Sequence, residues 1–109
     1  MSDEGLRRLR QMAELVLEQH SAKVAQASAA REAVRLRLAA LDRMPEAAGQ
    51  DNPALQMSWY LFETWAVPRR VELQRQAARC EADWLNALSE ARRAFARVQL
   101  LSRLPVKRR

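Results

Sequence analysis

Apolar residues recur through the first forty positions at steps of three and four, the spacing that aligns side chains on one face of a helix. We call the positions that would face a partner helix the seam. In this part of the chain the predicted seam consists of Leu6, Leu9, Ala13, Val16, His20, Val24, Ala27, Ala30, Val34, Leu38 and Leu41. The alternation is irregular between residues 20 and 34. We therefore expect a coiled-coil helix over 3–42 with a local disturbance in its middle.

The segment "RMPEAAGQDN" follows this helix and predicts a loop over 43–52. Asn52 followed by Pro53 is typical of a helix start. Asparagine caps free N–H groups, and proline fits the first helical position. Pro105 disfavours helix at the residue before it, so the second helix is predicted over 53–104.

The second helix carries its own seam, with regular steps of three and four. Its members are Leu73, Ala77, Cys80, Trp84, Ala87, Ala91, Ala94 or Phe95, Val98 and Leu101. Beyond the helix, residues 105–109 are predicted to be a disordered basic tail.

Two long amphipathic helices joined by a short loop cover their seams by lying antiparallel. Isoleucine is absent, there are only two glycines, and no stretch alternates between apolar and polar residues, which also favours helices. The predicted fold is therefore all-α: an antiparallel two-helix coiled-coil hairpin whose second helix is the longer one.

A loop centred near residue 47 makes the numbers of facing residues sum to about 95. This register places Phe62 and Trp65 opposite Ala33 and Ala30. It also makes the C-terminal part of the chain, from about residue 92, project past the first helix.

The segment "MSWYLFETWAVP" at 57–68, called the aromatic segment below, contains four of the six aromatic residues. One helical face is shared by Leu55, Trp59, Phe62 and Ala66, whereas Met57, Leu61 and Trp65 fall on other sides. One partner helix cannot cover a segment that is apolar nearly all round.

Pro68 predicts a kink or a break in the second helix. Two interpretations therefore stay open. Residues 53–67 could form a separate short helix folded onto the hairpin. Alternatively, the aromatic segment could bind a third helix, a second copy of the chain or another protein.

Positive charge is concentrated near the C-terminus. The net charge is +6, and residues 92–109 contain seven basic and no acidic side chains, whereas residues 1–42 are nearly balanced. Such a tip suits an acidic protein surface, a phosphate backbone or an anionic membrane. It also suits a helix C-terminus without any partner, because cations complement the helix dipole there.

The sequence shows no pattern typical of a catalytic or metal site. His20 is the only histidine and Cys80 the only cysteine, and both fall on the predicted seams. No second ligand stands at metal or triad spacing. We therefore expect no enzyme activity, no cofactor and no small-molecule substrate. The absence of an apolar leader and of a long apolar run predicts a cytoplasmic chain without a transmembrane segment.

Three stretches together resemble the FliJ/YscO family, the stalk proteins of flagellar and type III secretion ATPases. They are "LRRLRQMAELVLEQHSAKVAQA", "WYLFETW" and "ADWLNALSEARRAFARVQLLSRL". The likeness covers nearly the whole chain, although Pro68 departs from the family pattern. It implies a protein at the secretion apparatus that inserts its coiled-coil ends into an ATPase ring, assists ring assembly and links the ring to the export gate.

The resemblance also implies two sets of contact residues. The gate-binding set lies on the second helix just after the loop: Trp59, Phe62, Trp65, Val71 and Leu73. The ring-binding set lies near the C-terminus: Arg92, Arg93, Phe95, Arg97 and Arg103.

Other functions stay open at this level. The aromatic segment would also suit an export chaperone or adaptor that holds a client helix in a groove. A nucleic-acid binder would use the arginine-rich C-terminal arm, but no basic stripe runs along a whole helix. A freestanding coiled-coil homodimer is a further alternative.

Overall fold

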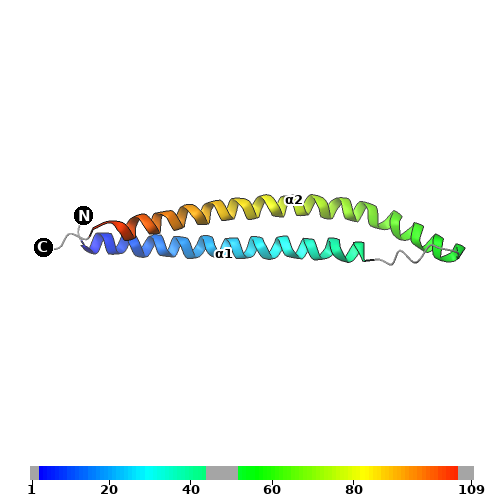
Figure 1. The fold of residues 1–109 in the computed structure, drawn as a ribbon, viewed down its shortest axis with the longest axis horizontal. Helices are drawn as coiled ribbons and strands as arrows, with labels where there is room; N and C mark the ends of the chain where they lie inside the picture. The colour runs from blue at the N-terminus through cyan, green and yellow to red at the C-terminus, as the bar shows by residue number, and fades with distance from the viewer. Residues whose placement is uncertain (1–2, 44–51, 106–109) are drawn as a thin grey trace. The chain divides into compact units, whose positions relative to one another are not determined.

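The computed structural model describes residues 3–43 and 52–105, which form two helices and no strand (Figure 1). Helix α1 spans Asp3–Asp42 and helix α2 spans Pro53–Arg103, 40 and 51 residues respectively. The helices run antiparallel, so the predicted all-α hairpin with a longer second helix is confirmed. Most of the predicted loop and basic tail (44–51 and 106–109) lies outside the described residues.

Packing divides the chain into two units, each built from a piece of both helices. Unit 1 combines Met1–Ala29 with Ala82–Arg109, and unit 2 is Ala30–Glu81. Unit 1 therefore contains the beginning of α1 and the end of α2. Unit 2 contains the end of α1 and the beginning of α2.

The seam of α1 is more regular than predicted. Residues 6, 10, 13, 17, 20, 24 and 27 are buried or half-buried, and the spacing continues through 34, 38 and 41. The predicted members Leu9, Val16 and Ala30 are exposed instead, and only Ala30 lies within the stretch 20–34 that was predicted to be irregular. Leu17 and Arg10 occupy the seam in unit 1.

Two hydrogen bonds to the end of α2 explain why Arg10 lies on the seam. Its Nε–H donates to the carbonyl oxygen of Leu101 at 2.8 Å, and Nη2 donates to that of Leu104 at 3.0 Å. The last carbonyl groups of a helix have no partner within the helix, and a cation there also complements the dipole. In unit 1, Arg10 therefore closes the end of α2 from the facing helix.

The seam of α2 follows the prediction from Leu73 to Leu101. The open choice at its C-terminal part is resolved in favour of Ala94, which is 3% exposed, whereas Phe95 is 53% exposed. Many of these seam residues are alanines, which lets larger residues of α1 pack against them.

The register differs from the prediction. Arg31 pairs with Glu81 (Nε to Oε2, 2.5 Å), and Asp42 pairs with Arg70 (Oδ1 to Nε, 3.3 Å). Facing residue numbers thus sum to about 112 instead of about 95. The predicted pairing of Phe62 and Trp65 with Ala33 and Ala30 is wrong, because those alanines face a later part of α2.

The corrected register also reverses the predicted overhang. Residues 92–104 do not project past α1, because Leu101 and Leu104 contact Arg10 there. In unit 2, Arg43 is the last described residue after the end of α1 and lies opposite position 69. The beginning of α2, including the aromatic segment, extends past it (Figure 1).

Helix α2 begins as the sequence predicted. The Asn52 side-chain oxygen accepts from the N–H of Ala54 at 3.0 Å, and the Asn52 carbonyl accepts from the N–H of Gln56 at 2.9 Å. Pro53 then occupies the first helical position, where its missing N–H leaves nothing unpaired.

Pro68 does not break α2, which is one continuous helix from Pro53 to Arg103. The interpretation of 53–67 as a separate helix folded back on the hairpin is therefore wrong. Pro68 has no N–H to give the carbonyl of Thr64. One turn earlier, the Thr64 hydroxyl donates to the carbonyl of Tyr60 at 2.8 Å, a bond that often accompanies helix bending.

Both helices form exposed ion pairs, including Arg8–Glu4 at 3.5 Å and Arg75–Glu72 at 3.6 Å. The hydrogen bond from Arg35 holds the pKa of the Glu32 carboxyl below its ordinary value of 4.5 and raises the pKa of the guanidinium. Such solvent-exposed pairs contribute little to stability. Stability therefore rests on the seam.

Candidate interaction surfaces

Three rings of the aromatic segment form a row along α2, which we call the aromatic row. The ring centroids of Trp59 and Phe62 lie 6.0 Å apart and those of Phe62 and Trp65 lie 5.7 Å apart, with tilted planes. Steps of three residues bring these rings to neighbouring positions on one helix. The Arg69 guanidinium carbon lies 4.2 Å from the Trp65 ring centroid and continues the row by a cation–π contact.

The aromatic segment exposes large apolar side chains on several sides. On the face that was predicted to be shared, Trp59 and Phe62 are half-buried and Ala66 is fully buried, whereas Leu55 is exposed. The outward residues are Met57, Tyr60, Leu61, Trp65 and Val67, between 48% and 64% exposed. Part of this segment is thus uncovered in unit 2, where the described part of α1 does not reach it.

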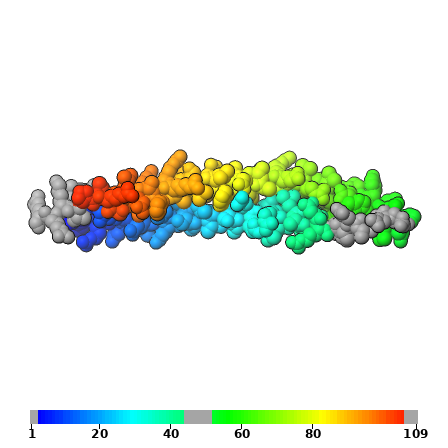
Figure 2. Space-filling model, viewed as in Figure 1, coloured from blue at the N-terminus to red at the C-terminus, as the bar shows by residue number. Residues whose placement is uncertain are grey.

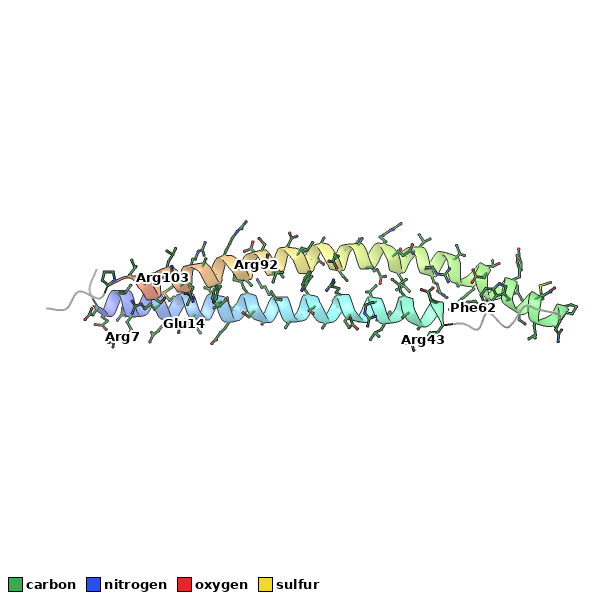
Figure 3. All side chains as sticks on the ribbon, in the orientation of Figure 1. Arg7, Glu14, Arg43, Phe62, Arg92 and Arg103 are labelled. Atoms are coloured by element: carbon green, nitrogen blue, oxygen red, sulfur yellow. The ribbon has the colours of Figure 1, made fainter. Side chains whose placement is uncertain are left out.

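Phe62 lies on the part of α2 past Arg43 (Figure 3). Figure 2 shows the residues at the beginning of α2, coloured green, on the surface of unit 2. This part of α2 runs for about 24 Å at 1.5 Å per residue. An exposed apolar helix of that length is a typical feature of a protein-binding surface.

Unit 1 has an open hollow of about 390 Å³ and unit 2 has one of about 510 Å³. The hollow in unit 2 adjoins the aromatic row. In unit 2 it is lined by Trp65, Pro68, Arg69, Glu72 and Leu73. The structure thus brings Leu73 together with Trp65, two members of the predicted gate-binding set. It does not bring Val71 into this hollow, where it is absent from the lining and 54% exposed.

The predicted ring-binding residues all lie on α2 in unit 1 and are exposed, but they do not form one patch. Arg92 and Arg103 are eleven residues apart, about three helical turns, so they share a face. Phe95 lies next to that face. Arg93 and Arg97 are one turn apart on a different face, and Arg93 pairs with Glu90 at 3.7 Å.

Figure 3 shows Arg7 of α1 and Arg103 of α2 where α1 begins and α2 ends in unit 1. Sequence reasoning took this region for a projecting single helix. It missed Arg10 as a seam residue, because an arginine beside Leu9 looks like an outward side chain. The signal that could have found it is a strict alternation of steps of four and three continued from Leu6 to Ala27, which holds only with Arg10 and Leu17 in place of Leu9 and Val16.

The two residues with potential chemistry lie on the seams. His20 is half-buried, and its Nδ1 has no hydrogen-bond partner in the described part of the chain. Cys80 is a free, half-buried thiol. Over residues 3–43 and 52–105, no group of three His, Cys, Asp or Glu side chains is placed to hold a metal ion.

The described helices also contain no stretch with the length and hydropathy needed to cross a membrane. Comparisons were made with family models, with curated proteins and with solved structures. None of them matches this chain. The assignment of a function therefore depends on the surfaces described above and on the resemblance of the sequence.

Proposed function

We propose that this chain is a non-enzymatic coiled-coil adaptor that serves as a stalk for a flagellar or type III secretion export ATPase. It promotes assembly of the ATPase ring and links the ring to the export gate. The observation that carries the proposal is the aromatic segment, a largely uncharged stretch of α2 that extends past the described end of α1 with its apolar side chains exposed.

The aromatic row supports the gate-binding half of the proposal. Trp59, Phe62 and Trp65 form a continuous apolar strip, and large aromatic side chains are the usual anchors of protein interfaces. Leu73 extends this surface through the hollow beside Pro68. Val71 belongs to the set through the resemblance alone.

The arginines of unit 1 support the ring-binding half. Arg92 and Arg103 share a face with Phe95 nearby, and no described residue forms an ion pair with either arginine. Exposed, unpaired arginines beside an aromatic ring suit an acidic protein surface, where they increase both specificity and association rate.

Charge reversal in unit 1 tests the proposal. We expect the wild-type chain to stimulate turnover and ring assembly of the export ATPase from the same organism. In a variant with Arg92→Glu and Arg103→Glu, the chain concentration needed for half-maximal stimulation should rise by about tenfold or more. Like charges would then face each other across the contact. The measurement is phosphate release as a function of added chain, with ring assembly followed by sedimentation.

Arg79→Glu is the matched control, because Arg79 is an exposed arginine of α2 in unit 2. It should leave the stimulation unchanged. Truncation before the C-terminal arginines is a poor test, since it also removes Ala94 and Leu101 from the seam. Equal stimulation by the double variant would contradict the ring contact, and no stimulation by the wild-type chain would contradict the stalk function.

The exposure of the aromatic segment also favours a second candidate function. A helical export chaperone or adaptor would use the same apolar strip to hold a client helix. Binding of a secreted substrate through the aromatic segment, without any effect on ATPase turnover or assembly, would support this function in place of the stalk.

A further inference from the structure

Unit 1 contains an apolar groove that the proposed function does not use. It has a volume of about 390 Å³ and runs between the two helices of the unit. Its α1 side includes Leu9, Met12 and Val16, and its α2 side includes Arg97, Leu100 and Leu101. Met12 is 62% exposed and Leu100 is 65% exposed, so the groove is open to a partner.

The lining residues have the spacing of two helical stripes. Leu9, Met12 and Val16 follow steps of three and four on α1, and Ala94, Arg97 and Leu101 do so on α2, with Leu100 beside them. Two parallel stripes of this kind form a trough for the apolar face of a third helix. Leu9 and Val16 are the residues that the sequence suggested for the seam, and their exposure leaves them available for this second contact.

The charge of the groove lining indicates which side chains a third helix would carry. Arg97 is the one charged residue in the lining, and it forms no ion pair with any described residue. Arg93, which pairs with Glu90, lies one turn away on the same face, and residues 92–105 contain four arginines and no acidic residue. A helix that fills the groove would therefore gain from carboxylates on its flank.

A second copy of this chain fits the groove poorly. Arg97 lies near the middle of the groove, halfway along the lined part of α2. A two-fold axis through the groove would bring the Arg97 side chains of both copies together. Like charges in such a contact are destabilising.

We propose that this groove binds an amphipathic helix of another protein, with an apolar stripe seated between Leu9 and Leu100 and glutamate or aspartate side chains facing Arg97. The proposal shares Arg97 with the ring-binding set but does not require an export ATPase. Peptide binding and ATPase turnover are measured separately, and the Arg92–Arg103 face lies elsewhere on α2, so each proposal can fail alone.

The test uses the full chain and a fluorescein-labelled helical peptide of about five turns, with leucines in one stripe and glutamates beside it. A matched peptide has glutamine in place of every glutamate. We expect fluorescence anisotropy to show about tenfold tighter binding of the acidic peptide. Arg97→Gln should abolish this preference, and Leu100→Gln should weaken binding of both peptides by about tenfold.

Leu36→Gln and Arg79→Gln are the matched control variants, because both residues are exposed and belong to unit 2. They should bind both peptides like the wild-type chain. All substituted residues are exposed, and circular dichroism verifies that each variant is folded. Failure of the acidic peptide to bind, or equal binding of the two peptides, would overturn the proposal. A wild-type dimer that Leu100→Gln converts to monomers would overturn it in favour of a second copy.

Discussion

Replacing Val34 by aspartate should unfold the protein at temperatures where the wild-type chain is folded, whereas the same change at Leu36 should be tolerated. Val34 is 5% exposed on the seam of unit 2, and Leu36, two residues away, is 50% exposed. The Val34 variant loses about 1.5 to 3 kcal/mol of apolar burial. It also buries a carboxylate, which costs several kcal/mol more unless the group is neutralised.

The expected loss is on the order of 5 kcal/mol, comparable to the whole stability of many small domains. Thermal unfolding followed by circular dichroism should show a midpoint lower by roughly 20 °C or more. Leu36→Asp should stay within about 0.5 to 1 kcal/mol of the wild type. Helix propensity alone predicts the opposite order, since leucine is the better helix former. Equal losses for the two variants would mean that α1 does not face α2 through Val34.

Replacing Pro68 by alanine should stabilise the protein by about 2 to 3 kcal/mol. Alanine restores an N–H that can donate to the carbonyl of Thr64 and removes the proline ring from the helix interior. The gain is reduced slightly because proline also restricts the unfolded chain. Urea unfolding should show a higher midpoint with an unchanged slope.

Val67→Ala is the control for this substitution. Val67 is 49% exposed and precedes Pro68, and shortening it restores no hydrogen bond. Its effect should stay within about 0.5 kcal/mol. A Pro68→Ala variant that is no more stable than the wild type would show that the helix already compensates fully for the missing hydrogen bond.

The fold class could be predicted because each helix carries strong local signals. Asn52 and Pro53 mark the start of α2, and its seam from Leu73 to Leu101 has a period that only a paired helix explains. Composition gave independent support, because the chain contains few residues that favour turns or strands.

The register could not be predicted, because it depends on the loop and on pairs distant in sequence. The alanine-rich α2 seam accepts α1 side chains in several registers with similar burial. Contacts such as the hydrogen bonds of Arg10 to the end of α2 favour the observed register. No local pattern identifies these partners.

Of the candidate surfaces, the aromatic segment could be predicted and the groove of unit 1 could not, because the groove depends on the register. An apolar segment that one helix cannot cover predicted uncovered residues around Trp65. Their exposure also depends on the register, which carries the segment past the described end of α1. The groove of unit 1 could not be found from the sequence. Leu9 and Val16 looked like seam residues, and their exposure follows only from the places that Arg10 and Leu17 take.

The register of the two helices places the aromatic segment past the described end of α1. A short bis-maleimide reagent tests it on dilute protein with the native Cys80, a free thiol. Our register places residue 31 next to Cys80, since Arg31 pairs with Glu81. The register predicted from the loop places residue 31 opposite Thr64.

We predict that a variant with Arg31→Cys is cross-linked within one chain to Cys80. A second variant, with Arg31→Cys, Thr64→Cys and Cys80→Ser, should not be cross-linked. Peptide mapping after proteolysis identifies the joined residues. Efficient cross-linking of the second variant, with none in the first, would contradict the register and the exposure of the aromatic segment that follows from it.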